Sequence, residues 1–304
     1  MAVEGCDVHY LRWGERFLPG LVLIHGGAAH AHWWSFLAPL LTRGFHVVAL
    51  DLSGHGDSGW RQSYDHEQWA REVLAVADDA QIVGKPILVG HSMGGFVSMV
   101  VASRSGDQLA GAIIVDAPVR RPDPESEEGA RGRAFRNPKV YASADEAMAH
   151  FRLVPSQPSE HAWIIEHVAR HSLRRVGGNG GSDGGGSGWT WKFDPAVFRR
   201  FAPPVFHDYL ADVRCRVAVL SGEFSDLVTP EVADYMSELL GRTAPFVEIP
   251  QAYHHLLLDQ PLAFVAALRA LLADWEHSVP SAGAVGSRPG PRVTHPPGVP
   301  ESRG

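Results

Sequence analysis

The stretch that decides the fold reads Ile87-Leu88-Val89-Gly90-His91-Ser92-Met93-Gly94-Gly95-Phe96. An apolar run enters Gly-x-Ser-x-Gly and passes directly into a helix-forming sequence, the strand–turn–helix order of a nucleophile elbow. A serine in such a tight turn takes a positive φ, and the chain on either side approaches itself closely, which favours glycine two positions away. The pattern therefore predicts that Ser92 projects at a helix N-terminus, where free N–H groups stabilise negative charge.

Apolar runs and helical patterns alternate along most of the chain. Buried strands are expected at 21–24, 45–50, 87–89, 111–116, 216–220 and 245–249, with an edge strand over 7–13. Helical patterns cover 32–42, 67–83, 96–103, 230–240 and 261–275. This alternation predicts an α/β fold, with a mostly parallel sheet flanked by helices on both faces.

The alternation breaks at Pro118 and resumes near residue 206. Between these points lie helical patterns at 145–153 and 160–175 with no strand between them, and a glycine-rich run at 177–188. We therefore expect an α/β core over 1–117 and 206–278, an inserted helical cap over 118–205, and a flexible loop at 177–188. Proline, glycine and serine dominate 279–304, which predicts a disordered tail.

Composition narrows the function classes. The chain has 304 residues, 45% of them hydrophobic, a formal net charge of −7 and two cysteines. These values fit one large core in a reducing compartment, and they give no electrostatic case for nucleic acid. No apolar run reaches membrane-spanning length, and residues 1–5 do not resemble a signal peptide. We expect a cytoplasmic protein with a small-molecule substrate and no nucleic-acid or membrane partner; the oligomeric state stays open.

A serine nucleophile needs a base, and the base needs an orienting group. In this strand order the partners follow as acid and then histidine, in loops beyond later strands. Asp226 follows the strand at 216–220, and His254 follows the strand at 245–249. Asp116 and His255 are the competing acid and base; the motif around Asp226 and the spacing after His254 favour the first pair.

Five motifs in order resemble the α/β-hydrolase superfamily, in its branch of capped bacterial esterases and carbon–carbon hydrolases. They are His25-Gly26-Gly27, Asp51-x-x-Gly54-His55-Gly56-Asp57-Ser58, Gly90-His91-Ser92-Met93-Gly94-Gly95, Gly222-Glu223-x-x-Asp226 and His254-x-x-x-Leu258-Asp259-x-Pro261. The resemblance covers about residues 7 to 276. The chain departs from the family pattern at Tyr253, where a glycine usually precedes the histidine.

The resemblance implies a role for each matched residue. Ser92 is the nucleophile, His254 the general base and acid, and Asp226 the group that orients His254. The backbone N–H groups of Gly27 and Met93 form the oxyanion hole. Serine at the elbow argues against epoxide opening and dehalogenation, for which family members use aspartate.

The reaction expected first is hydrolysis of carboxylic esters of small to medium acyl compounds through an acyl-enzyme, with no cofactor. A carbon–carbon hydrolase of ring-cleavage products is the alternative, and a non-catalytic ligand-binding member of the fold is a rival from another class. Trp33, Trp189 and Trp191 are expected to line the substrate pocket or to pack structurally. The histidine pairs His30/His32 and His167/His171 are interpreted as packing residues, so no metal site is expected.

Overall fold

The computed structural model describes residues 1–121, 138–177, 187–198 and 206–278. Its main sheet has the strand order β11-β10-β7-β6-β4-β5-β3, with β3 antiparallel at one edge and the other strands parallel. The strands are β3 (Tyr10–Trp13), β4 (Pro19–Ile24), β5 (His46–Leu50), β6 (Val83–His91), β7 (Gly111–Val115), β10 (Val217–Gly222) and β11 (Phe246–Ile249). The predicted fold class is confirmed.

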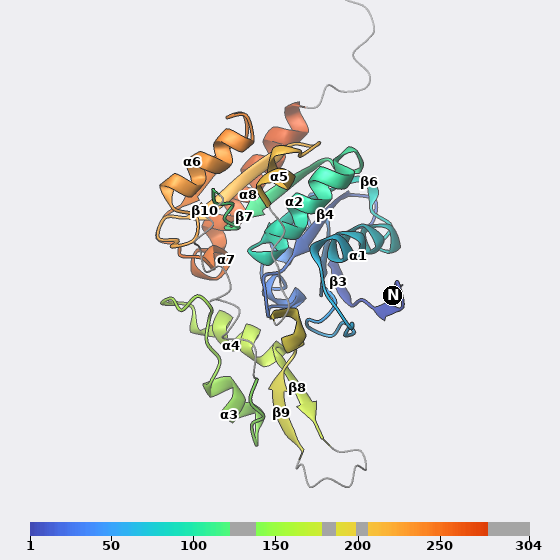
Figure 1. Ribbon diagram of the computed structural model, residues 1–304, viewed down its shortest axis with the longest axis vertical. Helices are drawn as coiled ribbons and strands as arrows, with labels where there is room; N and C mark the ends of the chain where they lie inside the picture. Colours follow the sequence, from blue (N-terminus) through green and yellow to red (C-terminus); the bar gives the residue numbers. More distant parts are fainter. Residues whose placement is uncertain (122–137, 178–186, 199–205, 279–304) are drawn as a thin grey trace, which may run out of the picture.

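Side chains of the central strands alternate between two hydrophobic cores. Leu21 and Leu23 of β4 face one core, and Val22 and Ile24 face the other. This period of two is what a strand buried on both faces requires, because successive side chains point to opposite sides. The sheet is therefore covered on both sides by helices (Figure 1).

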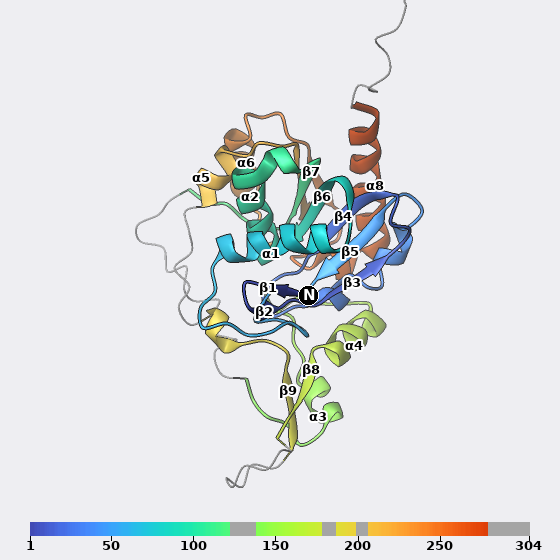
Figure 2. The same ribbon diagram turned by 90° about the vertical axis from the view of Figure 1, so that its right-hand side faces the viewer.

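The helices divide between the two faces. On one face lie α1 (His66–Asp79), α2 (Met93–Ser105), α5 (Phe206–Ala211) and α6 (Pro230–Leu239). On the other lie α8 (Pro261–Ser278) and the short turns η1 (Ala31–Trp33) and η2 (Ala38–Leu40), while α7 (Leu256–Asp259) leads into α8. Figure 2 shows α8 on the side of the sheet opposite α2. The parallel strands thus end together at one edge of a covered sheet.

One expected helix does not form. The pattern at 32–42 predicted a continuous helix, but the chain makes the 3₁₀ turns η1 and η2 instead. Pro39 lies inside the segment and cannot donate a backbone hydrogen bond, so a regular helix would be interrupted there. The turns still bury Trp33, Trp34 and Leu37 against the sheet.

The insertion between β7 and β10 is not purely helical, which corrects the expected helical cap. It contains α3 (Ala144–Ala149), α4 (Ala162–His171), the antiparallel hairpin of β8 (Leu173–Val176) and β9 (Gly188–Trp191), and the turn η5 (Pro195–Phe198). The helix expected to reach 175 ends at His171, because residues from 173 pair with β9. Figure 1 shows this hairpin extending away from the core. Most of the flexible loop expected at 177–188 lies outside the described residues, and so does the whole of the tail expected at 279–304.

The insertion is fastened to the core by a β-bridge and hydrogen bonds near residue 55. His55 forms an isolated bridge with Phe193, and the Lys192 carbonyl accepts a 2.7 Å hydrogen bond from Gly56 N–H. Tyr64 donates a 2.7 Å hydrogen bond to Asp194. These bonds place the chain after β9 beside the carboxyl edge of the sheet.

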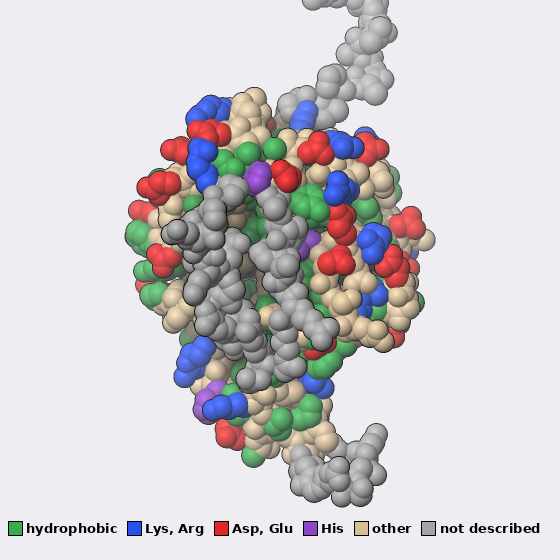
Figure 3. Space-filling view, viewed as in Figure 1, with side chains coloured by type: hydrophobic (Ala, Val, Ile, Leu, Met, Phe, Trp, Pro, Cys, Tyr) green, Lys and Arg blue, Asp and Glu red, His purple; other side chains and the backbone are tan. Residues whose placement is uncertain are grey.

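Within the described residues, none of the helices combines the length and apolarity required to cross a bilayer. On the face drawn in Figure 3, basic and acidic side chains are interspersed over the described residues rather than gathered by sign.

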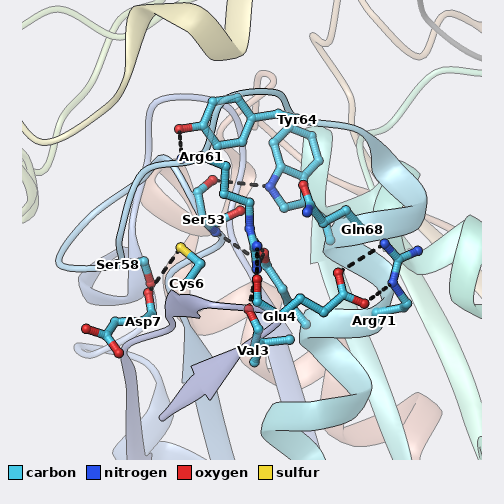
Figure 4. Close-up of polar contacts among 12 residues, drawn as sticks. Val3, Glu4, Cys6, Asp7, Ser53, Ser58, Arg61, Tyr64, Gln68 and Arg71 are labelled. Carbon is cyan, nitrogen blue, oxygen red and sulfur yellow. Dashed lines mark hydrogen bonds and ion pairs between the residues drawn. The ribbon is translucent and has the colours of Figure 1, made fainter.

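A buried ion pair connects the N-terminal hairpin of β1 (Ala2–Val3) and β2 (Cys6–Asp7) to helix α1. The Arg61 guanidinium lies 2.9 Å from a carboxylate oxygen of Glu72, which is fully buried. Arg61 also donates to the Val3 carbonyl at 2.7 Å, and Glu72 accepts from Ser53 N–H at 2.8 Å. Nearby, Arg71 pairs with Glu4 at the surface (Figure 4).

Arg61→Ala is therefore expected to destabilise the fold by about 3–5 kcal/mol, because it leaves the Glu72 carboxylate buried without its cation. Arg71→Ala is the matched control, and loss of its exposed pair should change the free energy of unfolding little, because solvent screens such pairs. Urea unfolding measures both. If Arg61→Ala lowered the free energy of unfolding as little as Arg71→Ala does, the buried pair would not be important for stability.

Candidate active site

Ser92 occupies a strained turn between β6 and α2. It has φ 53° and ψ −117° and stands at the N-terminus of α2. A Cβ on Gly90 would collide with the Gly94 carbonyl, and one on Gly94 would collide with the Ile24 carbonyl. The two glycines are thus needed for the close backbone approach that the sequence predicted, and the strain concentrates at the serine.

His254 lies in the loop after β11, and its side chain contacts Ser92. Its Nε2 is 3.1 Å from Ser92 Oγ, within hydrogen-bond distance. The loop is held by His91, whose Nε2–H donates to the His254 carbonyl at 3.0 Å. Burial lowers the pKa of His91 well below its usual value, so it serves as a neutral donor.

His255, the competing base, points elsewhere. It is buried, and its ring nitrogens have no hydrogen-bond partner among the described residues. Its ring packs against Trp33, with centroids 5.3 Å apart. The structure thus brings His254, and not its neighbour, to Ser92.

The acid beside His254 is Asp116, which corrects the preference for Asp226. Asp116 is fully buried at the end of β7, and its Oδ1 lies 3.6 Å from His254 Nδ1. Asp226 is exposed, and in the described part of the chain no hydrogen bond or ion pair joins it to His254. The reason is the phase of the turn after β10: Ser225 faces inward, and Asp226 faces solvent.

Ser225 occupies the place expected for the acid and binds Asp116 instead. Its hydroxyl donates to Asp116 Oδ1 at 2.7 Å and accepts from the Leu227 and Val228 N–H groups. The Gly222 N–H is 3.3 Å from the other carboxylate oxygen. Two donors therefore hold a buried carboxylate that would otherwise be costly to desolvate.

The turn after β4 places a backbone amide beside the elbow. A Cβ on Gly26 would contact Ser92, and one on Gly27 would contact the Met93 side chain at 3.9 Å. Among the described residues, neither the Gly27 nor the Met93 N–H has a hydrogen-bond acceptor. Both amides are thus available to a ligand oxygen near Ser92.

His25 fixes the orientation of that turn. Its Nε2 accepts from Leu52 N–H at 3.0 Å, so the ring proton resides on Nδ1, which donates to the Gly26 carbonyl at 2.7 Å. The Gly26 carbonyl and the Gly27 N–H belong to one peptide plane and point in opposite directions. The hydrogen bond from His25 fixes the direction of the Gly26 carbonyl, and it thereby fixes the Gly27 N–H in the opposite direction.

The Asp51 carboxylate organises the motif after β5. It accepts from Ala31 N–H at 2.6 Å and from Asp57 N–H at 3.0 Å, and it pairs with His9 at 2.7 Å. The carboxylate raises the pKa of His9, which favours the charged pair. Asp51 thus joins three segments behind the candidate site, and it is a structural anchor rather than a reacting group.

The three tryptophans considered for the pocket lie in two separate places. Trp33 is buried near His91 and His255. Trp191 packs on Tyr141 and Phe151 inside the insertion, and Trp189 lies under Arg175 in the same hairpin. Phe198, which the sequence did not indicate, packs against the turn after β4, since a Cβ on Gly27 would meet its ring at 3.3 Å.

The sequence is similar to known hydrolases. Residues 21–268 fit the model of the alpha/beta hydrolase family. The chain is 25% identical over 279 residues to esterase Rv0045c of Mycobacterium tuberculosis, covering 89% of this chain and 88% of that protein. It is 35% identical over 118 residues to a bifunctional esterase/perhydrolase of Acinetobacter calcoaceticus, covering 38% of this chain and 42% of that one.

Solved structures show the same fold. E-2-(acetamidomethylene)succinate hydrolase superposes with a TM-score of 0.75 at 22% identity, covering 88% of this chain and 95% of that one. A thermophilic esterase from Thermogutta terrifontis gives a TM-score of 0.68 at 24% identity, covering 90% and 96%. With an elbow, a histidine and an acid at the carboxyl edge of such a sheet, the chain is a hydrolase enzyme that belongs to the alpha/beta hydrolase family.

Proposed function

We propose that this enzyme hydrolyses carboxylic esters of small to medium acyl compounds, with Ser92 as nucleophile, His254 as base and Asp116 as the group that orients His254. The observation that carries the proposal is the 3.1 Å contact between Ser92 Oγ and His254 Nε2 at a strained elbow. The relative from Mycobacterium tuberculosis, which matches over most of both chains, is an esterase.

The proton path follows from the position of each nitrogen. His254 Nε2 accepts the proton of Ser92 as its oxygen attacks the acyl carbon, and returns it to the leaving alkoxide. Nδ1 then carries an N–H in a buried site, where its nearest acceptor is Asp116 at 3.6 Å. That distance exceeds a hydrogen bond, and it shortens as positive charge develops on the ring. In the second step His254 Nε2 takes a proton from water as the water attacks the acyl-enzyme, and it returns this proton to Ser92 Oγ.

The negative charge of the tetrahedral intermediate falls on the acyl oxygen. The Gly27 and Met93 N–H groups are the donors proposed for it, with Gly27 oriented through the His25 bond to Gly26. Loss of one such donor typically costs roughly 10²–10³ in rate. Phe198 and the Met93 side chain line the same point, which favours an apolar acyl group over a charged one.

Substrate panels and a covalent probe test the reaction. The wild-type chain should hydrolyse p-nitrophenyl esters, fastest with small to medium acyl chains, and a fluorophosphonate should label Ser92. Ser92→Ala should lose both properties. Turnover of a ring-fission dienone with no ester turnover would favour the carbon–carbon hydrolase, and an unlabelled Ser92 in folded protein would favour a ligand-binding role.

The identity of the acid is tested by a matched pair. Asp116→Asn should lower kcat by roughly 10³–10⁴-fold, because the amide cannot stabilise the imidazolium of His254. Asp226→Asn, an exposed change of the same chemistry in the neighbouring loop, should leave kcat within about twofold, since surface changes away from a site have small effects. The reverse ranking would restore Asp226 as the acid.

A further inference from the structure

Three histidines from distant segments meet where the insertion contacts the core. His32 lies in η1, which follows the turn after β4, and His167 and His171 lie one turn apart on α4. One ring nitrogen from each lies within 4.8 Å of the others. The rings of His32 and His171 are stacked with centroids 3.7 Å apart, and all three side chains are partly exposed.

Hydrogen bonds leave lone pairs available in this cluster. Ser35 Oγ donates to the His32 carbonyl at 3.0 Å, so the hydroxyl is left to accept from His167 Nε2–H at 2.8 Å. His167 Nδ1 then carries a lone pair. His32 Nδ1 is buried with no hydrogen-bond partner in the described part of the chain.

We propose that His32, His167 and His171 bind a divalent transition-metal ion of the zinc type, which fastens helix α4 of the insertion to the core. Imidazole nitrogens suit zinc and its neighbours, and residues four apart on a helix present two ligands on one face. The proposal revises the expectation from sequence that these histidines only pack.

The geometry requires little movement. Zinc–nitrogen bonds of about 2.1 Å place tetrahedral ligands about 3.4 Å apart, so the nitrogens close by at most about 1.4 Å from their present separation. The stacked rings of His32 and His171 tilt to bring their nitrogens together. Ser35 supplies the outer hydrogen bond that orients a histidine ligand.

The charge environment permits a cation. Two cations act on the cluster, and both are paired: Lys192 with Asp57 at 2.6 Å and Arg170 with Glu166 at 2.7 Å. Metal binding requires neutral imidazoles, so Zn²⁺ affinity at this site should fall as the pH is lowered.

In two other clusters of possible ligands, some of the ligand atoms already take part in contacts described above. Asp51 binds two backbone amides and His9, in the group His9, Asp51 and Asp57. In the group His91, His254 and His255, one nitrogen of His91 holds the His254 carbonyl and one nitrogen of His254 contacts Ser92. The histidine cluster on α4 lies outside the proposed reaction path, so its test is independent of esterase activity.

The test uses the untagged full-length chain after removal of metal by chelation. Calorimetric titration with Zn²⁺ should show one site, Zn²⁺ should raise Tm, and Co²⁺ should give the visible absorption of a four-coordinate site. His32→Asn and His171→Gln should each weaken Zn²⁺ affinity by at least about 10–100-fold, the loss caused even by an outer partner of a ligand. His150→Ala, an exposed histidine of the same insertion, is the control and should bind as wild type does.

Near-UV circular dichroism establishes that each variant is folded before titration. Failure of the folded wild-type chain to bind one Zn²⁺ would overturn the proposal. So would equal affinity in wild type, His32→Asn and His171→Gln, which would assign the zinc to other histidines.

Discussion

The close approach of the backbone at Gly90 and Gly94 is the constraint on which the rest of the site depends. With no side chain at either position, β6 turns into α2 at once and leaves Ser92 with φ 53°. The turn sets the serine at the carboxyl edge of the sheet, between the loops that follow β4 and β7. Each neighbouring loop can then contribute one element to the site, an amide from Gly27 and a carboxylate from Asp116.

Asp116 repeats the strain seen at the elbow. It directly follows β7 with φ 47°, a left-handed conformation that is unfavourable for an aspartate. Ser225 and Gly222 hold its carboxylate by hydrogen bonds, so the strained backbone is fixed by the strand beyond. Ser92 and Asp116 thus both have strained backbones and both lie beside His254. Such strain costs stability, and here it fixes the positions of two side chains around one histidine.

The sheet could be predicted from the sequence because buried parallel strands are continuous apolar runs, as at residues 21–24 and 111–115. The strained turn that carries Ser92 could be predicted because its glycine spacing is a steric requirement. The position of Asp116 beside His254, in place of Asp226, could not, because it depends on which side chain after β10 turns inward, and that phase is tertiary information. A signal was present in Asp116, which ends a strand next to the elbow. The meeting of His32 with α4 depends on how the insertion docks, which no local pattern encodes.

A crystal structure of the chain with a fluorophosphonate bound to Ser92 tests the central claim most directly. The account predicts a phosphoryl oxygen about 2.7–3.1 Å from both the Gly27 and Met93 nitrogens. It also predicts that the Asp116 carboxylate closes to within about 3.2 Å of His254 Nδ1, while Asp226 stays in solvent. An oxygen that avoids these amides, or Asp226 on His254 in place of Asp116, would contradict the account.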